Sequence, residues 1–354
     1  MSTQRAPSSA LTAFVVASRY MPVFIAIGVL LVVAMIWAPA TLGSVPLRAI
    51  APLAAVLAIA ALGQMLVIMT GGIDLSVPGT MSLAAVIMVG VGQQTDERVL
   101  TAILIAIGGA AIVGLVNGIL IGGLKLNPLI VTLAVGQVAT GAVFRYGRSF
   151  AVQNPVPTGW SEWVTTRIVG VSAVFWIGLA LTIVLGLGLR YTTVGRRFQA
   201  VGANPVASHA VGVRVNLNQI LAYVVAAVFY AAAALALAGI IRRPGAFVGT
   251  QYLLAPIAAV VIGGASLTGG QASAVATFAA AVFLTGLNQM MRIMGLPTAL
   301  QFVVFGLVII GGMLVSGDRI IRGVEYALRR RRHLDRPQVQ TERGALDGTR
   351  EGGA

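Results

Sequence analysis

Long runs without a charged residue dominate the chain and predict membrane-spanning helices. The runs cover residues 21–47, 49–73, 75–95, 99–124, 126–144, 168–189, 215–241, 244–291 and 293–317. Because about 20 apolar residues span a bilayer core, each run can supply one helix, and 244–291 is long enough for two. The polar turn Ser266–Gln271 divides that run. The pattern therefore predicts an all-α polytopic membrane protein with about ten transmembrane helices.

A single acid, Asp74, interrupts the apolar sequence between Arg48 and Asp96. It lies between the pair Gly71-Gly72 and the break Ser76-Val77-Pro78-Gly79. A charge at membrane depth costs about 2.5–3.5 kcal/mol, so it persists where protein or water surrounds it. Broken backbone there is tolerated under the same condition. The segment predicts a transport pathway, with Asp74 either as the N-cap of the next helix or as an acceptor for substrate hydroxyls or a gating partner.

A weak internal repeat relates two parts of the chain. Residues 67–76 resemble residues 261–268, with their glycine pairs aligned at an offset of 192. Further on, residues 114–117 resemble residues 286–288 at a spacing shorter by about one span, which predicts an extra helix in the first half. Paired, glycine-interrupted apolar segments mark the substrate region of a transporter. Chance similarity is the alternative in a chain with 43 glycines.

Composition narrows the function further. Hydrophobic residues make up 58% and charged residues 10%, against about 25% charged in soluble domains. With no cysteine, the chain has neither disulfides nor thiolate metal sites. A phosphate-binding loop requires Gly-Lys-Ser/Thr, and the one lysine, Lys125, stands between Leu124 and Leu126. We therefore expect a transport subunit that is not an enzyme and binds no cofactor or metal, with any ATP hydrolysis on a separate chain.

The net charge of +14 comes from arginines that flank apolar spans without base-stacking aromatic residues, so nucleic acid is not the expected partner. With ten spans and a cytoplasmic N-terminus, 16 of the 24 basic residues fall on the cytoplasmic side, as the positive-inside rule requires. We expect a cytoplasmic arm over 1–20, a permease domain over 21–316 and a basic, disordered cytoplasmic tail over 317–354. The run Arg329–Arg332 is expected to contact anionic lipid.

Polar side chains deep in the spans are the candidates for a substrate path. They are Gln64, Asp74, Ser76, Asn117, Asn288 and Gln289. Amides and hydroxyls donate and accept hydrogen bonds without fixed charge, which suits a neutral polyol. The alternative is that they join helices, at about 0.6 kcal/mol per hydrogen bond on average.

Residues 190–216 form the longest internal polar loop. Asn204 is a suitable N-cap and Pro205 a suitable first helical residue, which predicts a short helix from there. Residues 193–201 are expected to form a preceding helical turn hinged at Gly202. The apolar residues Phe198, Val201, Val206 and Val211 are expected to face a groove on a soluble partner. A plain amphipathic helix on the lipid surface is the alternative.

Several segments together resemble one family, the permease subunits of ABC importers for monosaccharides of the ribose, xylose and galactose type. They are Thr70–Ser76, Asn117-Gly118, Lys125–Leu133, Thr193–Arg196 with Ala200–Asn204, and Gly263–Gly270. The resemblance implies import across the bacterial inner membrane, and a dimer with a second copy or a homologue. It also implies soluble ATPase subunits carrying ATP and Mg, and a periplasmic or lipoprotein sugar-binding protein. The residues that match the family's ATPase-contacting loop are Thr193, Gly195, Arg196, Phe198, Gly202 and Asn204.

Pro78 departs from the family, which commonly has glycine directly after Ile-Asp-Leu-Ser-Val; a proline there removes a backbone donor and stiffens the turn. Two other functions remain open. An ion-coupled secondary carrier requires more intramembrane acids than Asp74 alone. An ABC permease for branched-chain amino acids or nucleosides is closer, although such substrates favour charged or aromatic path residues, and aromatics are 6% here.

Overall fold

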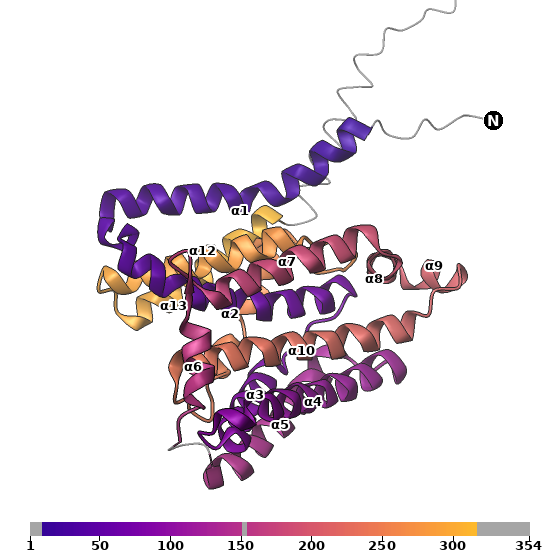
Figure 1. The fold of residues 1–354 in the computed structure, drawn as a ribbon. Helices are drawn as coiled ribbons and strands as arrows, with labels where there is room; N and C mark the ends of the chain where they lie inside the picture. Colours follow the sequence, from indigo (N-terminus) through magenta and orange to yellow (C-terminus); the bar gives the residue numbers. More distant parts are fainter. Residues whose placement is uncertain (1–8, 151–153, 317–354) are drawn as a thin grey trace, which may run out of the picture. The chain divides into compact units, whose positions relative to one another are not determined.

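The computed structural model describes residues 9–150 and 154–316, and over these the predicted all-α architecture is confirmed (Figure 1). The two short strands, β1 (Arg167–Ile168) and β2 (Val171–Ser172), form one antiparallel hairpin with Arg167 opposite Ser172. The first helix begins at Ser9, inside the predicted N-terminal arm. The predicted tail, including Arg329–Arg332, lies outside the described residues.

Each of the ten predicted spans contains an apolar helix. Within the described ranges, seven helices are long and apolar enough to cross a membrane: α1 (Ser9–Trp37), α2 (Ser44–Met69), α4 (Val99–Gly118), α5 (Pro128–Phe150), α7 (Ala173–Tyr191), α10 (Val215–Ile241) and α12 (Ala274–Ile293). Three are shorter: α3 (Val77–Gly92), α11 (Ala255–Ile262) after the 3-10 turn η4 (Thr250–Tyr252), and α13 (Thr298–Ser316), whose apolar stretch runs to Gly312. The number of helices that cross therefore stays a prediction.

The remaining elements connect the spans. They are η1 (Pro39–Leu42), η2 (Asp96–Arg98), the π-turn η3 (Ile119–Gly123) that extends α4, and the short helices α6 (Thr158–Thr165), α8 (Thr193–Ala203) and α9 (Pro205–Ala210). The helices α8 and α9 join the end of α7 to the start of α10, whereas α6 precedes α7 and bonds to the end of α10 through Ser161 Oγ and Gly239 O. Consequently α6 and the α8–α9 pair lie at opposite ends of the helices (Figure 1).

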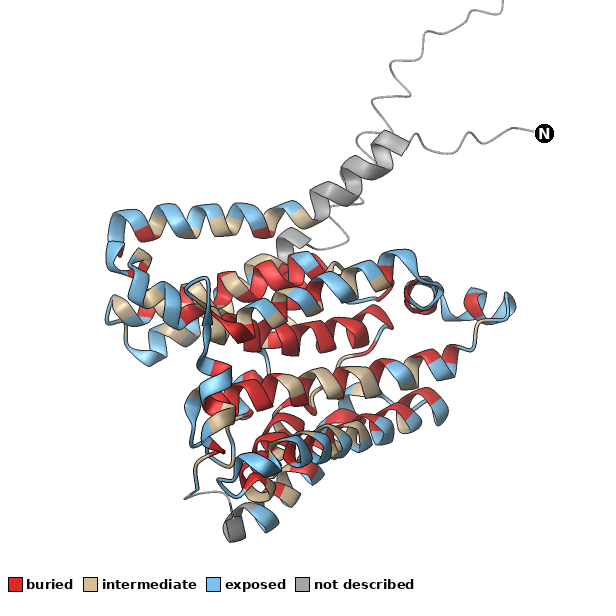
Figure 2. Cartoon of the chain, in the orientation of Figure 1, coloured by how far each residue is buried: buried red, intermediate tan, exposed pale blue. Residues whose placement is uncertain are grey.

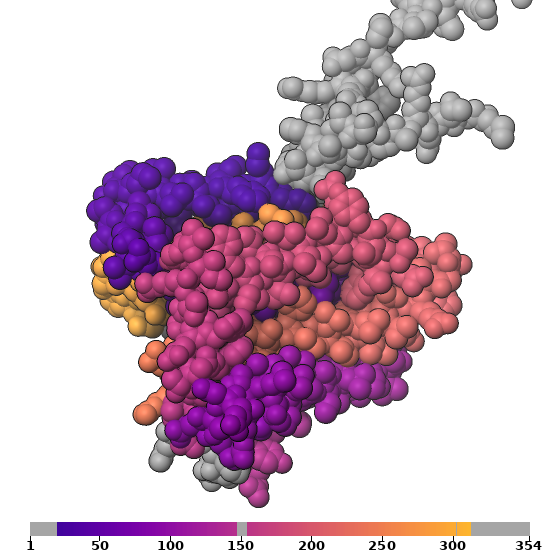
Figure 3. All heavy atoms as spheres, in the orientation of Figure 1, coloured from indigo at the N-terminus to yellow at the C-terminus, as the bar shows by residue number. Residues whose placement is uncertain are grey.

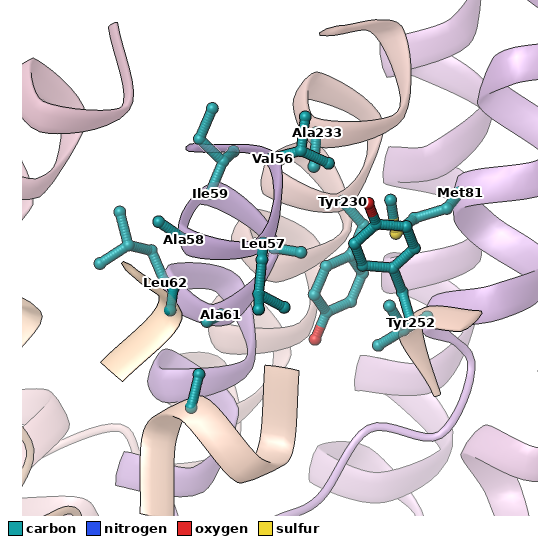
Figure 4. Close-up of a cluster of buried hydrophobic side chains, with 14 of the residues drawn as sticks. Val56, Leu57, Ala58, Ile59, Ala61, Leu62, Met81, Tyr230, Ala233 and Tyr252 are labelled. Carbon is teal, nitrogen blue, oxygen red and sulfur yellow. The ribbon is translucent and has the colours of Figure 1, made fainter. Parts of the chain in front are cut away.

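Two helices, α2 and α10, form the centre of the packing. Every residue of α2 from Ala54 to its last residue, Met69, is buried, which is typical of a helix that is apolar on all sides and surrounded by protein. The buried face of α10 carries alanines four residues apart, such as Ala222 and Ala226. Small residues at this spacing let helix backbones approach closely in membranes. Figure 4 shows this core, where Tyr230 of α10 lies with Met81 of α3 and Tyr252 of η4.

The other helices surround this pair. On one side α2 contacts α7, α11 and α12, and on the other side it contacts α10, which in turn packs against α3 and α4. The outermost helices are α5 on α3 and α1 on α12. Over its described side chains, α1 is largely exposed, whereas α2 is exposed near its start and buried from Ala54 to Met69 (Figure 2). The exposed apolar faces are those that would contact lipid.

The two glycine-pair segments adopt the same backbone turn. After α2, Gly71 N donates to Ile68 O at 2.9 Å and Gly72 N donates to Val67 O at 3.1 Å. After α11, Gly264 N donates to Val261 O at 2.9 Å and Ala265 N donates to Val260 O at 3.2 Å. Gly71 and Gly264 have φ of 85° and 82°, so both turns are Schellman motifs with glycine in the left-handed position.

The repeat is therefore supported at these turns, but its register is corrected. The structure pairs Gly71 with Gly264, an offset of 193, whereas aligning the glycine pairs by sequence gave 192. The left-handed residue is the first glycine in one pair and the second in the other. In the first half, α3 and α4 lie between the glycine turn and α5. In the second half, α12 alone lies between the glycine turn and α13, which matches the predicted extra helix.

Replacing Gly71 with alanine is expected to lower the free energy of unfolding by about 1–2 kcal/mol, because an L side chain disfavours the left-handed region. The matched control is Gly108→Ala in α4, where an added Cβ meets no atom within 4 Å. Since alanine is favoured over glycine inside a helix by up to about 1 kcal/mol, the control should be neutral or stabilising. Denaturation in mixed detergent micelles measures both. Equal stability of the two variants would contradict the turn assignment.

Candidate functional site

The carboxylate of Asp74 starts a chain of buried hydrogen bonds next to the first glycine turn. Asp74 Oδ1 accepts from Ser76 N at 2.8 Å and from Ser76 Oγ at 2.6 Å. Ser76 Oγ in turn accepts from Asn117 Nδ2 of α4 at 2.9 Å. All three residues are buried. Ser76 and Asn117 are 41 positions apart in the sequence, which predicted both as path residues, and the fold brings them into direct contact.

The interpretation of Asp74 as the N-cap of the following helix is wrong. The N-cap of α3 is Ser76, whose carbonyl accepts the first helical bond from Thr80 N, and Asp74 lies two residues earlier. Its bond to Ser76 N forms a local Asx turn that orients the chain before the helix begins. Pro78 is the second residue of α3, where a backbone N–H has no helical partner in any case, so the departure from the family costs no hydrogen bond.

Gln64 of α2 holds the backbone of Asp74. With its amide oriented by the surrounding network, Gln64 Oε1 accepts from Asp74 N and Nε2 donates to Asp74 O, both at 3.1 Å. The same amide lies 2.8 Å from the hydroxyl of Tyr230 on α10. Gln64 is fully buried. It thereby ties the broken segment to both central helices.

Two further contacts complete the buried polar cluster, by which we mean Gln64, Asp74, Ser76, Asn117, Thr132, Tyr223 and Tyr230. Thr132 Oγ1 of α5 accepts from Leu75 N at 2.9 Å and donates to Pro128 O at 2.8 Å. The hydroxyl of Tyr223 lies against Gly72, where an added Cβ would be 2.3 Å from it. Residues from α2, α4, α5 and α10 therefore meet around one connecting segment.

Sequence reasoning missed Tyr223 and Tyr230, although a signal was present. They are the two tyrosines of the apolar run 215–241 and are seven residues apart, which places both hydroxyls on one helix face. Tyrosine in a buried helix ordinarily finds a polar partner. That rule, applied to this spacing, predicts that their face of α10 meets a polar group.

Three oxygen atoms of the cluster are buried with no hydrogen-bond partner among the described residues. They are Asp74 Oδ2, Asn117 Oδ1 and Tyr223 Oη. A buried carboxylate oxygen without a donor is costly, because the interior does not solvate its charge. The three atoms belong to neighbouring residues and include both donor and acceptor capacity. The cluster therefore has unused hydrogen-bonding capacity for substrate, water or a different arrangement of its own side chains.

The remaining two predicted path residues lie elsewhere. Asn288 and Gln289 are half-buried on α12, and Asn288 Oδ1 accepts from Arg292 Nε at 3.1 Å. Their helix follows the second glycine turn, as α3 follows the first. The structure thus gathers Gln64, Asp74 and Ser76 with Asn117 and leaves the two α12 residues apart, so a role for these two in the path stays a prediction.

The predicted coupling loop forms two consecutive capped helices. Thr192 caps α8 by accepting from Gly195 N at 3.2 Å, and Asn204 caps α9 by accepting from Ala207 N at 3.0 Å. The predicted helix start at Asn204-Pro205 is confirmed. The predicted hinge at Gly202 is wrong, because α8 continues to Ala203 and the direction changes at Asn204.

The two helices divide their apolar residues between the protein and the outside. Phe198 and Val201 are 4% and 0% exposed, so the expectation that they face a soluble partner is wrong; they anchor α8 to the rest of the helix bundle. By contrast Val206 and Val211 are 81% and 79% exposed. Arg196 and Arg197 of α8 are also exposed, and Figure 3 shows this part of the chain at the edge of the molecule. The helix pair therefore exposes two apolar side chains and two positive charges.

Basic residues gather at the same end. Lys125 Nζ donates to Asn216 Oδ1 and Gln219 Oε1 at the start of α10, and Arg190 and Arg214 flank the α8–α9 pair. This agrees with the predicted distribution of charge, while the assignment of this end to the cytoplasm stays a prediction. Within the two described ranges, no group of three or more His, Asp or Glu side chains is placed to hold a metal ion.

The family model and the similar proteins are all described as permeases of transport systems. Residues 46–313 match the family described as branched-chain amino acid transport system / permease component. The chain is 33% identical to the probable ABC transporter permease protein y4mJ of Sinorhizobium fredii, over 73% of this chain and 78% of that protein. It is 31% identical to the ribose import permease protein RbsC of Escherichia coli, over 74% and 82% respectively. It is 30% identical to the autoinducer 2 import system permease protein LsrC of an Enterobacter species, over 85% and 87%. No solved structure matches the chain significantly.

Proposed function

This chain belongs to the permease-component family of branched-chain amino acid transport systems, and from that membership we propose that it is the membrane subunit of an ATP-driven monosaccharide importer. Similarity to a ribose import permease over most of both chains supports the substrate class. The buried polar cluster is also compatible with it, because amides and hydroxyls match the hydrogen-bonding groups of a sugar. We expect the finer selectivity to reside in a sugar-binding protein outside the membrane.

The observation that carries the proposal is the outward surface of α8 and α9. The helix pair exposes the apolar side chains of Val206 and Val211 and the charges of Arg196 and Arg197, which are groups that can dock into a groove on a soluble partner. Capping at Thr192 and Asn204, together with buried Phe198, holds this surface rigidly on the permease. We assign it to an ATPase subunit that carries ATP and Mg. A second permease copy or a homologue completes the pore.

The test is purification of the tagged full chain from its native membranes, followed by mass spectrometry of the proteins that remain bound. A soluble ATPase and an exported binding protein are expected. Ligand screening of that binding protein then identifies the substrate. A monosaccharide supports the proposal, while a branched-chain amino acid, which the family's description names, would replace the substrate class and keep the importer. Repeated recovery of the intact chain alone, with proton- or sodium-driven uptake, would overturn it.

Glutamate at both Val206 and Val211 is expected to weaken ATPase binding at least tenfold, about 1.4 kcal/mol, because two charges replace the apolar contact. The matched control is Val169→Glu, which is 88% exposed in the hairpin at the opposite end of the helices. The amount of ATPase recovered with each tagged variant is the measurement. Equal loss in the control, or no loss in the double variant, would remove the ATPase from this surface.

A further inference from the structure

The end of α8 touches the first glycine turn at Gly202, where the nearest atoms are backbone atoms. A Cβ added at Gly202 would lie 1.8 Å from Met69 O, the carbonyl of the last residue of α2. No side chain separates the two segments at this point. Side chains can absorb a displacement by changing rotamer, whereas a close-packed backbone contact transmits it.

The residues that follow the second glycine turn, up to Gln271, close the same junction. Gly270 N donates to Met69 O at 2.8 Å, so the segment after α11 is bonded directly to the end of α2. A Cβ at Gly269 would lie 2.7 Å from Gly202 O, and one at Gly270 would lie 3.1 Å from Ala203 Cβ. Gly202, Met69 and Gly270 thus form a junction, called here the glycine junction, in which α8 contacts the broken segments of both halves.

The opposite end of α8 is held in the same manner. A Cβ at Gly195 would lie 2.2 Å from Leu189 O in α7. Gly195 and Gly202 are seven residues apart and share the buried face of the helix with Phe198. The exposed face, with Arg196 and Arg197, is opposite. A partner that moves the exposed face of α8 therefore acts on a short helix whose two ends are both in backbone contact with the rest of the protein.

The junction leads directly to the buried polar cluster. Asp74 follows Met69 by five residues, and within that stretch Gly72 lies against the hydroxyl of Tyr223. A shift of the α2 end consequently changes the position of Asp74 relative to Tyr223 and Asn117. These are the residues whose buried oxygen atoms have unused hydrogen-bonding capacity.

We infer that the glycine junction passes movement of α8 to the broken segments of both halves at once, each a glycine turn with the residues after it, and that Gly202 is a positioning residue for transport through the buried polar cluster. The inference rests on the proposed function, in which α8 receives its movement from an ATPase. A coupling claim requires a measured two-state response of the elements involved. The segments to observe are therefore α8 and the two broken segments, each a glycine turn with the residues that follow it.

Hydrogen–deuterium exchange on the purified complex of permease and ATPase, with and without a non-hydrolysable ATP analogue and Mg, is the test. Peptides covering 193–204, 64–76 and 263–271 are expected to change protection together when the analogue is added. A change in 193–204 with both turns unchanged would overturn the inference and leave the proposed function intact. No change in 193–204 despite nucleotide bound to the ATPase would instead remove α8 as the coupling element, and the inference with it.

The variant Gly202→Ala separates coupling from binding. It is expected to keep the response of 193–204 and to reduce the response of both turns at least twofold. Gly188→Ala in α7, where an added Cβ meets no atom within 4 Å, is the matched control and should keep all three responses. A full response of the turns in Gly202→Ala would contradict the inference. If that variant does not fold, the wild-type measurement alone decides.

Discussion

Replacing Asp74 with asparagine is expected to leave the protein at least as stable as the wild type while uptake falls at least tenfold, about 1.4 kcal/mol in the transport barrier. Asparagine keeps Oδ1 as an acceptor for Ser76 N and Oγ, so the local turn is preserved. It removes a buried charge whose second oxygen has no donor among the described residues, which is neutral or stabilising for folding. A charge kept at this cost is expected to serve another state of the transport cycle.

Alanine at the same position separates structure from charge. Asp74→Ala leaves the amide and hydroxyl of Ser76 without their acceptor, and we expect about 2–3 kcal/mol of lost stability. Denaturation in mixed micelles measures stability, and cellular uptake of the substrate found on the binding protein, with ribose as the first probe, measures transport. Full uptake by a stable asparagine variant would limit Asp74 to shaping the turn.

Leucine at Gln64 is expected to cause the largest loss of stability of the changes considered, about 3 kcal/mol or more. The side chain of similar size removes the partner of Asp74 N, Asp74 O and the hydroxyl of Tyr230 together. Each buried polar group left unpaired costs about 1–3 kcal/mol. The free energy of unfolding in mixed micelles is the measurement, and Tyr230→Phe should lose only part of that energy.

The matched control is Gln289→Leu, the same change at a half-buried position on α12. A substitution away from a buried network ordinarily changes stability by about 0.5 kcal/mol or less. A similar loss in both variants would indicate a general intolerance of leucine in these helices. In that case Gln64 would have no special part in holding the broken segment.

Much of the fold could be predicted because its signals are local. Charge-free runs located an apolar helix in each of the ten predicted segments, and Asn204-Pro205 located the start of α9. The sequence also identified four residues that meet in one cluster. The register of the internal repeat was harder to predict. Aligning the two glycine pairs matches Gly71 with Gly263, whereas the left-handed backbone position of the second turn falls on Gly264.

What the sequence could not provide is which faces meet. In an apolar, alanine-rich helix such as α2, no face is marked as inward, so the spacing of the α10 tyrosines predicts a polar partner but does not identify Gln64 as that partner. The same limit explains Phe198. The sequence shows only an apolar residue in a polar loop, and the structure shows that this residue is buried. The limit also explains why Asn288 looked equivalent to Asn117 and is not in the cluster.

By itself, the sequence determined that this chain is a polytopic helical membrane protein with two glycine-broken segments and a capped helix pair between spans, because apolar run length, caps and glycine act within a few residues. The tertiary structure decided that the end of α8 meets the broken segments of both halves, and that Asp74 lies among Ser76, Asn117 and Gln64. The contact between Ser76 and Asn117 joins residues 41 positions apart, and that between Met69 and Gly202 joins residues 133 positions apart. They depend on helix packing between surfaces that the sequence leaves almost uniformly apolar.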